Sequence, residues 1–318
     1  MATKFLIVSP PYDERVGGAV VLHKLCSILN GLGYESYLHP YHKRYRLNSN
    51  FVKIWFRRLK GRYRHRKGDY GRYAVNPVFD TPVLHVVDDS LLKECVVVYP
   101  ETVFGNPLNS QRVVRWFLHD PGFHMETVNY EKNELYFKYR TGIKDFHYSG
   151  SVVSDIILKV VHCPLEDYNL DDVPSNRKGT AYCLRKGKHK PIQHALNGSI
   201  LIDGKSNSEI AGIFKRVKTF ISYDTCTAYS RFAVLCGCQS IIVPDEGVTK
   251  EQLRPNPADR YGLAYGFDNV EAESETAHLV KEKILSEERQ SVENVKDAVI
   301  EINEFFDGLE QSLIKEQQ

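Results

Sequence analysis

Small hydroxyl side chains gather at one point in the second half of the chain, directly after the apolar run 219–222. Thr225, Thr227 and Ser230 lie where the pattern of apolar residues predicts the first turns of a helix. The first backbone N–H groups of a helix are unpaired and carry a partial positive charge, so they can bind a phosphate. The hydroxyls would add hydrogen bonds to that anion. The alternative is that Asp224 or Thr225 only caps the helix.

A strongly basic segment lies between Lys43 and Arg72, with twelve Lys or Arg residues and one acid, although the net charge of the whole chain is only +2. Aromatic residues alternate with the cations in its middle part. Such a segment can lie in the headgroup layer of an anionic membrane. A solvated loop is the alternative, and without a nucleic-acid-binding motif we expect no nucleic-acid partner. The residues expected to contact a membrane or an anionic acceptor are Lys53, Trp55, Phe56, Arg57, Arg58 and Lys60.

The composition is that of a globular protein with two domains. The chain has 318 residues, of which 42% are hydrophobic and 26% charged. No apolar run approaches the roughly 18 residues of a membrane-spanning helix, and residues 1–9 predict a first strand, not a secretory signal. Seven scattered cysteines without a CxxC pair indicate reduced thiols and a cytoplasmic protein.

Two series of alternating strand and helix patterns predict two doubly wound α/β domains. The first series has strands near 5–8, 35–39, 95–99 and 113–118 and a helix over 19–31. The second has strands near 180–184, 199–202, 219–223 and 240–243 and helices over 208–217 and 225–236. The polar stretch 166–178 is the best linker candidate. The expected domains are 1–170, with the basic insertion 43–72, and 171–290, followed by a C-terminal helix, 291–318, that can pack back on the first domain.

The order of several motifs resembles one enzyme family. The second half contains Tyr-Asp-x-x-Thr-x-x-Ser at 223–230, Leu-Cys-Gly-Cys at 235–238 and Val-Pro-Asp at 243–245. The first half contains Gly-Gly at 17–18 and Asp-Pro-Gly at 120–122. Together they resemble the bacterial glycosyltransferases of the GT-B fold that build surface polysaccharide (O-antigen, capsule or lipopolysaccharide). The resemblance covers most of the chain outside 43–72.

The resemblance implies two Rossmann-like domains facing a central cleft, with a nucleotide-sugar held mainly by the second domain. The sugar would pass to a membrane-associated saccharide or lipid-linked acceptor, on a protein located at the inner face of the membrane. Fixed cations after the first strand of that domain would stabilise the leaving diphosphate. The implied donor-binding residues are Gly17, Gly18, Arg185, Lys186, Lys190, Tyr223, Asp224, Thr225, Thr227, Ser230 and Glu246.

One departure from the family concerns catalysis. Retaining GT-B enzymes commonly carry two glutamates eight positions apart on the donor helix, whereas this chain has Asp224 at the first position and Phe232 at the second. The anomeric outcome therefore stays open. An inverting transfer needs a base near the acceptor hydroxyl. Glu101 is the first candidate because it ends a strand of the first domain, and His119 and Asp120 are its rivals.

Neither a metal nor a cofactor is expected beside the nucleotide-sugar itself. No Asp-x-Asp element follows an apolar strand, and the nearest imitation, Asp88-Asp89, has adjacent acids. Two other functions fit the same pattern. One is a sugar-nucleotide epimerase or hydrolase of the same fold, and the other is a non-catalytic nucleotide-sugar-binding subunit of a polysaccharide assembly complex.

Overall fold

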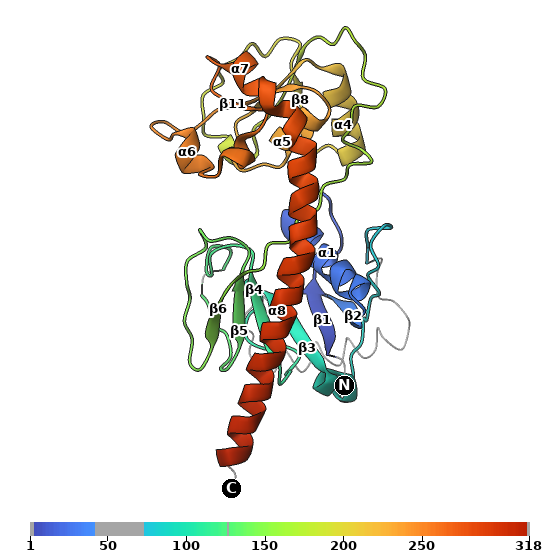
Figure 1. Ribbon diagram of the computed structural model, residues 1–318, viewed down its shortest axis with the longest axis vertical. Helices are drawn as coiled ribbons and strands as arrows, with labels where there is room; N and C mark the ends of the chain where they lie inside the picture. The colour runs from blue at the N-terminus through green and yellow to red at the C-terminus, as the bar shows by residue number, and fades with distance from the viewer. Residues whose placement is uncertain (1–2, 42–72, 126, 317–318) are drawn as a thin grey trace. The chain divides into compact units, whose positions relative to one another are not determined.

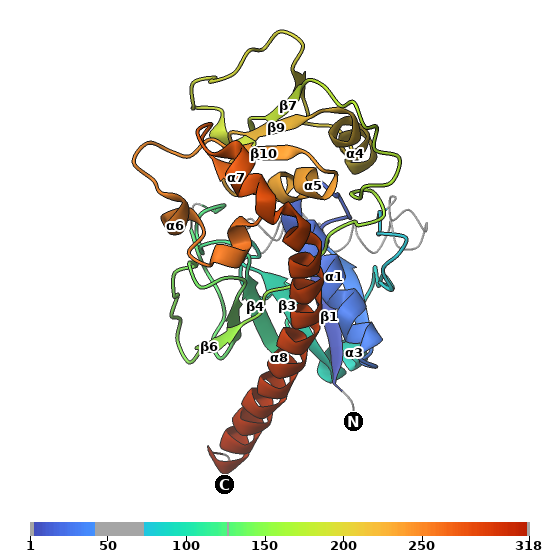
Figure 2. The same ribbon diagram turned by 45° about the horizontal axis from the view of Figure 1, so that its top comes forward.

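The computed structural model describes residues 3–41, 73–125 and 127–316, with side chains up to residue 312. The chain divides into two compact units, each with its own sheet (Figures 1 and 2). Unit 1 consists of Met1–His162 and Glu288–Gln318, and unit 2 of Cys163–Glu287. The boundary after His162 lies eight residues before the expected one at 170, and the boundary after Glu287 lies three residues before the expected one at 290.

Unit 1 is built on six parallel strands in the order β2-β1-β3-β4-β5-β6. The strands are β1 (Lys4–Ser9), β2 (Ser36–Pro40), β3 (Cys95–Pro100), β4 (Val113–Phe117), β5 (Leu135–Lys138) and β6 (Val152–Ile157). β1, β3 and β4 are almost continuously apolar and buried, as expected for strands covered on both faces.

Two long helices cover one face of this sheet. α1 (Gly17–Gly31) and the C-terminal part of α8 (Val280–Glu316) share a core with the side chains of alternate strand positions. Both figures show α8 running along the sheet of unit 1. Val295, Val299 and Ile302 pack there against the strand residues, which fixes the C-terminal helix on unit 1. The short α3 (Asp89–Glu94) packs on the other face.

Unit 2 is built on five parallel strands in the order β11-β10-β9-β7-β8. The strands are β7 (Thr180–Cys183), β8 (Ile200–Leu201), β9 (Thr219–Ser222), β10 (Gln239–Ile242) and β11 (Leu263–Tyr265). α4 (Asn207–Arg216), α5 (Tyr229–Leu235) and the first turns of α8 share a core with one face, and α7 (Val270–Ser274) packs on the other. Along the chain, α6 (Lys250–Leu253) follows β10 and precedes β11.

The strand orders locate the places where ligands bind in such sheets. In each sheet the second strand lies on one side of the first and the remaining strands on the other. The order therefore reverses between β1 and β3 in unit 1 and between β7 and β9 in unit 2. Ligands of doubly wound sheets bind outside the carboxyl ends of the strands at this switch point. The predicted fold class of two Rossmann-like domains with a C-terminal helical segment is confirmed.

Two expectations about local structure are wrong. The stretch 166–178 is not a linker but part of unit 2, because Tyr168 is fully buried, stacks on Phe232 at 4.5 Å between ring centroids and donates its hydroxyl to Asn207. The helix expected from residue 225 begins only at Tyr229, because Asp224 accepts a hydrogen bond from the backbone of Cys226 and forms a turn first. Among the described residues, no helix is both long and apolar enough to cross a membrane.

Candidate functional site

The loop after β7 is held in an unusual conformation at the switch point of unit 2. Arg185 has a φ of 41°, which is uncommon for a residue with a Cβ. The carboxylate of Asp203, which follows β8, accepts hydrogen bonds from the backbone N–H of Leu184 at 3.2 Å and of Arg185 at 2.9 Å. Strained backbone that its surroundings hold in place tends to occur at functional sites, where it presents a side chain in a fixed direction.

The same loop packs tightly on the end of β9. A Cβ added to Gly187 would overlap the backbone carbonyl of Tyr223, so only glycine fits there. Tyr223 is fully buried, and its hydroxyl accepts a hydrogen bond from the Gln193 backbone at 2.7 Å and lies 2.8 Å from Nδ1 of His194. Tyr223, expected as a donor-binding residue, thus holds the loop in place and does not present its hydroxyl to a ligand.

The turn after β9 brings the predicted hydroxyl groups together. Asp224 accepts the Cys226 N–H at 3.0 Å, and Thr227 accepts the Tyr229 N–H at 3.3 Å. Thr225 is half-buried in this turn. Ser230 lies in the first turn of α5, is fully buried, and its hydroxyl has no hydrogen-bond partner among the described residues. A buried hydroxyl without a partner is costly, so the Ser230 hydroxyl lacks the hydrogen bond that its burial requires.

The guanidinium of Arg185 faces this turn. Its Nε lies 3.7 Å from Oδ2 of Asp224, and its Cζ lies 5.2 Å from the ring centroid of Tyr229. The Arg185 side chain is 35% exposed while Asp224 is 5% exposed, so part of the Arg185 side chain remains accessible from outside. Arg185 and the turn therefore form a partly cationic cradle at the carboxyl end of the sheet.

Three other predicted donor-binding residues, Lys186, Lys190 and Glu246, differ in how accessible they are to a ligand. The Nζ of Lys190 lies 2.8 Å from the Val243 carbonyl and 3.2 Å from Asp245, and its side chain is nearly buried. Burial acts to raise the pKa of Asp245, but the hydrogen bonds and charges of Lys190 and His189 together outweigh it and lower the pKa. Lys190 therefore joins the loop to the end of β10 and is not free to bind a ligand. Lys186 and Glu246 are exposed at the same edge.

Glu101 follows β3 at the switch point of unit 1, but it is used inside the protein. It is 5% exposed, and its Oε2 accepts the backbone N–H of Leu118 at 3.0 Å, while its carbonyl accepts the hydroxyl of Tyr130 at 2.8 Å. Glu101 therefore ties the loop after β3 to the end of β4. This role makes it a poor candidate for a base that must reach an acceptor hydroxyl.

His119 and Asp120 follow β4 at the same edge of the sheet. Nδ1 of His119 accepts the Asp120 N–H at 2.8 Å, so the neutral imidazole carries its proton on Nε2. The His119 ring stacks on Phe123 at 3.9 Å between centroids. Oδ1 of Asp120 accepts the Lys144 N–H at 2.9 Å, and no described residue bonds to Oδ2. Asp120 is half-buried whereas Glu101 is 5% exposed, so the Asp120 carboxylate is the more accessible of the two predicted acidic bases.

Gly17 and Gly18 begin α1 directly after β1 and its loop. The N-cap residue, Val16, makes no side-chain cap, and no acidic residue lies in the first turn, so the first N–H groups of this 15-residue helix are not occupied by a carboxylate of that turn. No heavy atom lies within 4 Å of a Cβ placed on Gly17. The prediction that a ligand approaches the backbone here is compatible with this open space.

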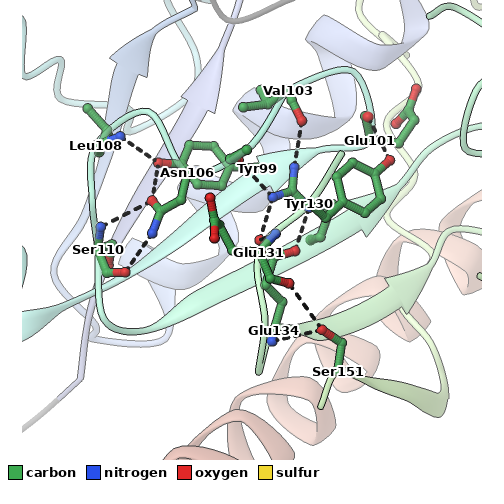
Figure 3. Close-up of polar contacts among 12 residues, drawn as sticks. Tyr99, Glu101, Val103, Asn106, Leu108, Ser110, Tyr130, Glu131, Glu134 and Ser151 are labelled. Carbon is green, nitrogen blue, oxygen red and sulfur yellow. Dashed lines mark hydrogen bonds and ion pairs between the residues drawn. The ribbon is translucent and has the colours of Figure 1, made fainter. Parts of the chain in front are cut away.

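A buried ion pair fixes the loop after β3 in unit 1 (Figure 3). Arg115 and Glu134 are 0% and 1% exposed, with 2.6 Å between Nη2 and Oε1. Arg115 also donates to the carbonyls of Val103 at 2.7 Å and Gly105 at 3.0 Å, and its Cζ lies 3.9 Å from the ring centroid of Tyr130. Burial opposes the charge of Arg115, but the hydrogen bonds and charge of Glu134 raise its pKa. Arg115 thereby positions the loop that begins at Glu101.

A cavity of about 840 Å³ in unit 1 lies at the opposite edge of that sheet. It is lined by residues at the amino ends of strands and on α8, among them Lys4, Glu94, Arg112 and Asp307. Its charges are largely paired, since Lys4 lies 3.1 Å from both Glu35 and Glu94. It lies away from the carboxyl ends that hold the predicted chemistry, and none of the predicted site residues lines it.

Some expected features lie outside the described residues. The membrane or acceptor residues Lys53, Trp55, Phe56, Arg57, Arg58 and Lys60 belong to this part of the chain. Within residues 3–41, 73–125 and 127–316, the structure has no cluster of three or more His, Cys, Asp or Glu side chains placed to hold a metal. Metal independence remains a prediction.

Three residues of the unit 2 site were missed in the sequence. Asp203 fixes the Arg185 backbone, Tyr229 underlies its guanidinium, and Arg254 donates from Nη2 to the Thr225 carbonyl at 3.1 Å. Asp203 follows the strand β8, so its place after a strand was a usable signal. No sequence signal pointed to Arg254, because it lies 29 residues from Thr225 along the chain.

Comparison with known proteins gives only distant similarity. No family model and no curated protein sequence matches the chain. Among solved structures, the chain is similar to MurG of Acinetobacter baumannii, with a TM-score of 0.34 and 10% identity over 95% of this chain and 100% of that one. It is also similar to the spinosyn forosaminyltransferase SpnP, with a TM-score of 0.35 and 11% identity over 93% and 95% of the two chains. At these values the similarities assign neither a family nor an activity.

Proposed function

We propose that this protein is a glycosyltransferase of the GT-B type that binds a nucleotide-sugar on unit 2 and transfers the sugar to an acceptor hydroxyl. The observation that carries the proposal is the cradle at the β7/β9 switch point. There the strained Arg185 faces a turn that holds Asp224, Thr225 and Thr227, followed by the hydroxyl of Ser230, which has no partner among the described residues. A cation with small hydroxyl donors suits a diphosphate, whose negative charge grows as it leaves the sugar.

The reaction balances with residues of this chain alone. The acceptor oxygen forms a bond to the anomeric carbon, the bond from that carbon to the diphosphate breaks, and the nucleoside diphosphate leaves with the electron pair. The proton of the acceptor hydroxyl needs a base. We assign it to Asp120, because Oδ2 of this carboxylate is not bonded by described residues, whereas Glu101 is buried and bonded to Leu118.

The acceptor class rests on the basic segment between Lys43 and Arg72. Its twelve cations among aromatic residues favour an anionic membrane surface or an anionic lipid-linked saccharide. We therefore place the protein at the cytoplasmic face of a membrane, as a peripheral protein that acts on a membrane-associated acceptor, in the synthesis of a surface polysaccharide. No metal takes part in this proposal.

A thermal-shift panel with the diphosphates UDP, GDP and dTDP, and with the monophosphate CMP for comparison, tests the donor site. We expect one nucleotide to raise the melting temperature of the wild-type protein and to lose this effect in Arg185→Ala and Thr227→Ala. The nucleotide that binds identifies the donor, and the wild-type protein should then transfer the sugar from the corresponding nucleotide-sugar to an acceptor. Release of free sugar without an acceptor product would favour a hydrolase, and binding without turnover would favour a non-catalytic subunit. No response to any nucleotide at millimolar concentration would contradict the proposal.

A further inference from the structure

The chain between β10 and α8 in unit 2 is held by ion pairs, and one cation in it has no carboxylate partner among the described residues. The pairs are Lys250–Glu273 at 2.6 Å, Arg260–Glu251 at 2.6 Å and Lys283–Asp259 at 3.2 Å between nitrogen and oxygen. Arg254 lies in the same stretch and forms no ion pair with any residue that the structure describes. The paired cations serve the fold of this segment, so Arg254 calls for a separate explanation.

Arg254 directly follows α6, and its side chain reaches the turn after β9. Its Nη2 donates to the carbonyl of Thr225 at 3.1 Å. Its Nε is buried without a hydrogen-bond partner in the described part of the chain. Tyr265, the last residue of β11, is close enough that the charge of Arg254 acts against the effect of burial, which raises the pKa of the Tyr265 hydroxyl. The guanidinium therefore lies near the ends of both β9 and β11.

Two guanidinium groups thus lie at the turn after β9, and they come from segments that follow the strands on either side of β9 in the sheet. Arg185 follows β7 and faces Asp224, whereas Arg254 comes from the β10–β11 side and contacts Thr225. A half-buried guanidinium with unused donors and no counter-charge is unfavourable until an anion binds beside it. The arrangement matches a ligand with two linked anionic groups better than one with a single charge.

We propose that Arg254 is an anion-binding residue of the unit 2 site, which binds a phosphate group of the nucleotide diphosphate from the side opposite Arg185. This assignment rests on the proposed function for the identity of the ligand. The planar fork of arginine can donate two hydrogen bonds to one phosphate, which a lysine cannot do with the same geometry. Arg254→Lys should therefore retain only part of the affinity.

The test measures binding of UDP, GDP, dTDP and inorganic pyrophosphate by isothermal titration calorimetry, with the phosphate-free nucleoside as a further ligand. We expect Arg254→Ala to lower the affinity for the diphosphate that binds the wild type by at least about tenfold, since hydrogen bonds to charged groups contribute this much. The affinity of Arg254→Lys should lie between those of the wild type and Arg254→Ala, and the affinity for the nucleoside should not change in either variant. Arg260→Ala is the matched control, because it removes a paired arginine of the same segment, and it should bind within about twofold of wild type.

The outcomes separate this inference from the proposed function. If the wild type binds pyrophosphate through Arg254 but no nucleotide, the anion site stands and the glycosyltransferase proposal fails. If the wild type binds a nucleotide and Arg254→Ala binds it equally well, the inference on Arg254 is wrong and the donor site stands. Equal loss of nucleoside and diphosphate binding in Arg254→Ala would indicate a purely structural role and would also overturn it. A wild type that binds neither class of ligand contradicts both.

Discussion

The α-carbon of Gly187 lies so close to the backbone carbonyl of Tyr223 that any side chain at this position would overlap the carbonyl oxygen. This contact seats the loop after β7 on the end of β9, and the loop carries Arg185. The relationship joins the two strands that flank the switch point of unit 2. The position of Arg185 therefore depends on Gly187, a buried glycine two residues further along the same loop.

Gly187→Ala should therefore displace the loop. We expect the free energy of unfolding of unit 2 to fall by about 1–3 kcal/mol, as for other over-packed positions. The nucleotide-induced rise in melting temperature should disappear. Gly212→Ala is the matched control. Gly212 lies within α4, and a Cβ at this position would meet no heavy atom within 4 Å, so alanine should stabilise the helix by about 0.5–1 kcal/mol and leave binding unchanged. Wild-type nucleotide binding by Gly187→Ala would contradict the positioning role.

The buried pair of Arg115 and Glu134 should show strong coupling. Arg115→Met and Glu134→Leu each leave one buried charge alone, which costs about 3–5 kcal/mol, whereas the double variant removes both charges and should recover most of that loss. Urea unfolding followed by tryptophan fluorescence reports on unit 1, because both tryptophans of the chain lie before residue 163. Additive losses in the double variant would show that the two side chains act independently.

Asp120→Asn and Glu101→Gln should separate catalysis from loop structure. We expect Asp120→Asn to lower kcat by about 10²–10⁴-fold, the usual contribution of a general base, with nucleotide binding unchanged. Glu101→Gln keeps a side-chain oxygen for the Leu118 N–H and should retain most of the activity. A larger loss of kcat in Glu101→Gln than in Asp120→Asn would return the base to Glu101.

His23 should make unit 1 less stable in mild acid. It is fully buried, its Nε2 lies 3.0 Å from the Pro10 carbonyl, and burial lowers its pKa against the opposing effect of that hydrogen bond. Below a pH of about 6.5 the unfolded chain protonates this imidazole more readily than the folded protein does, so stability falls as the pH falls.

Thermal unfolding between pH 7.5 and 5.5, followed by tryptophan fluorescence, measures this effect. The loss of stability on acidification should be smaller in His23→Gln, which retains an N–H donor and does not titrate in this range. His147→Gln replaces an exposed histidine of the same unit and should follow the wild type. An identical pH dependence in wild type and His23→Gln would exclude His23 as the source.

The basic segment should determine membrane binding. Reversing Lys53, Arg57, Arg58 and Lys60 to glutamate should abolish co-sedimentation with vesicles that contain anionic lipid, because each cation near the surface contributes about 1 kcal/mol. The same reversal at four exposed lysines elsewhere, Lys93, Lys132, Lys281 and Lys296, is the control and should leave binding nearly unchanged. Equal loss in both variants would show that only net charge matters.

The amino-acid sequence by itself determined the layout of the two units. Continuous apolar runs such as 5–8 and 95–99 are expected for strands buried on both faces of a parallel sheet, and their alternation with helix patterns predicts doubly wound units. The strands β5, β6 and β11 were not predicted: the apolar run of β6 is interrupted by Ser154 and Asp155, and β5 and β11 contain only the short runs Leu-Tyr-Phe and Leu-Ala-Tyr. The same apolar runs located the polar residues at the strand ends, including Arg185 and the turn at 224–227.

Only the tertiary structure decided which of those polar groups are free for chemistry. Tyr223, Lys190 and Glu101 have suitable side chains at suitable strand ends, but their polar atoms are taken up by Gln193, Asp245 and Leu118. Arg254 and Asp203 enter the site from other segments that are distant along the chain. The physical reason is that a buried polar group must find a partner, and in a parallel sheet the neighbouring strand ends and loops that supply it are far away in the sequence.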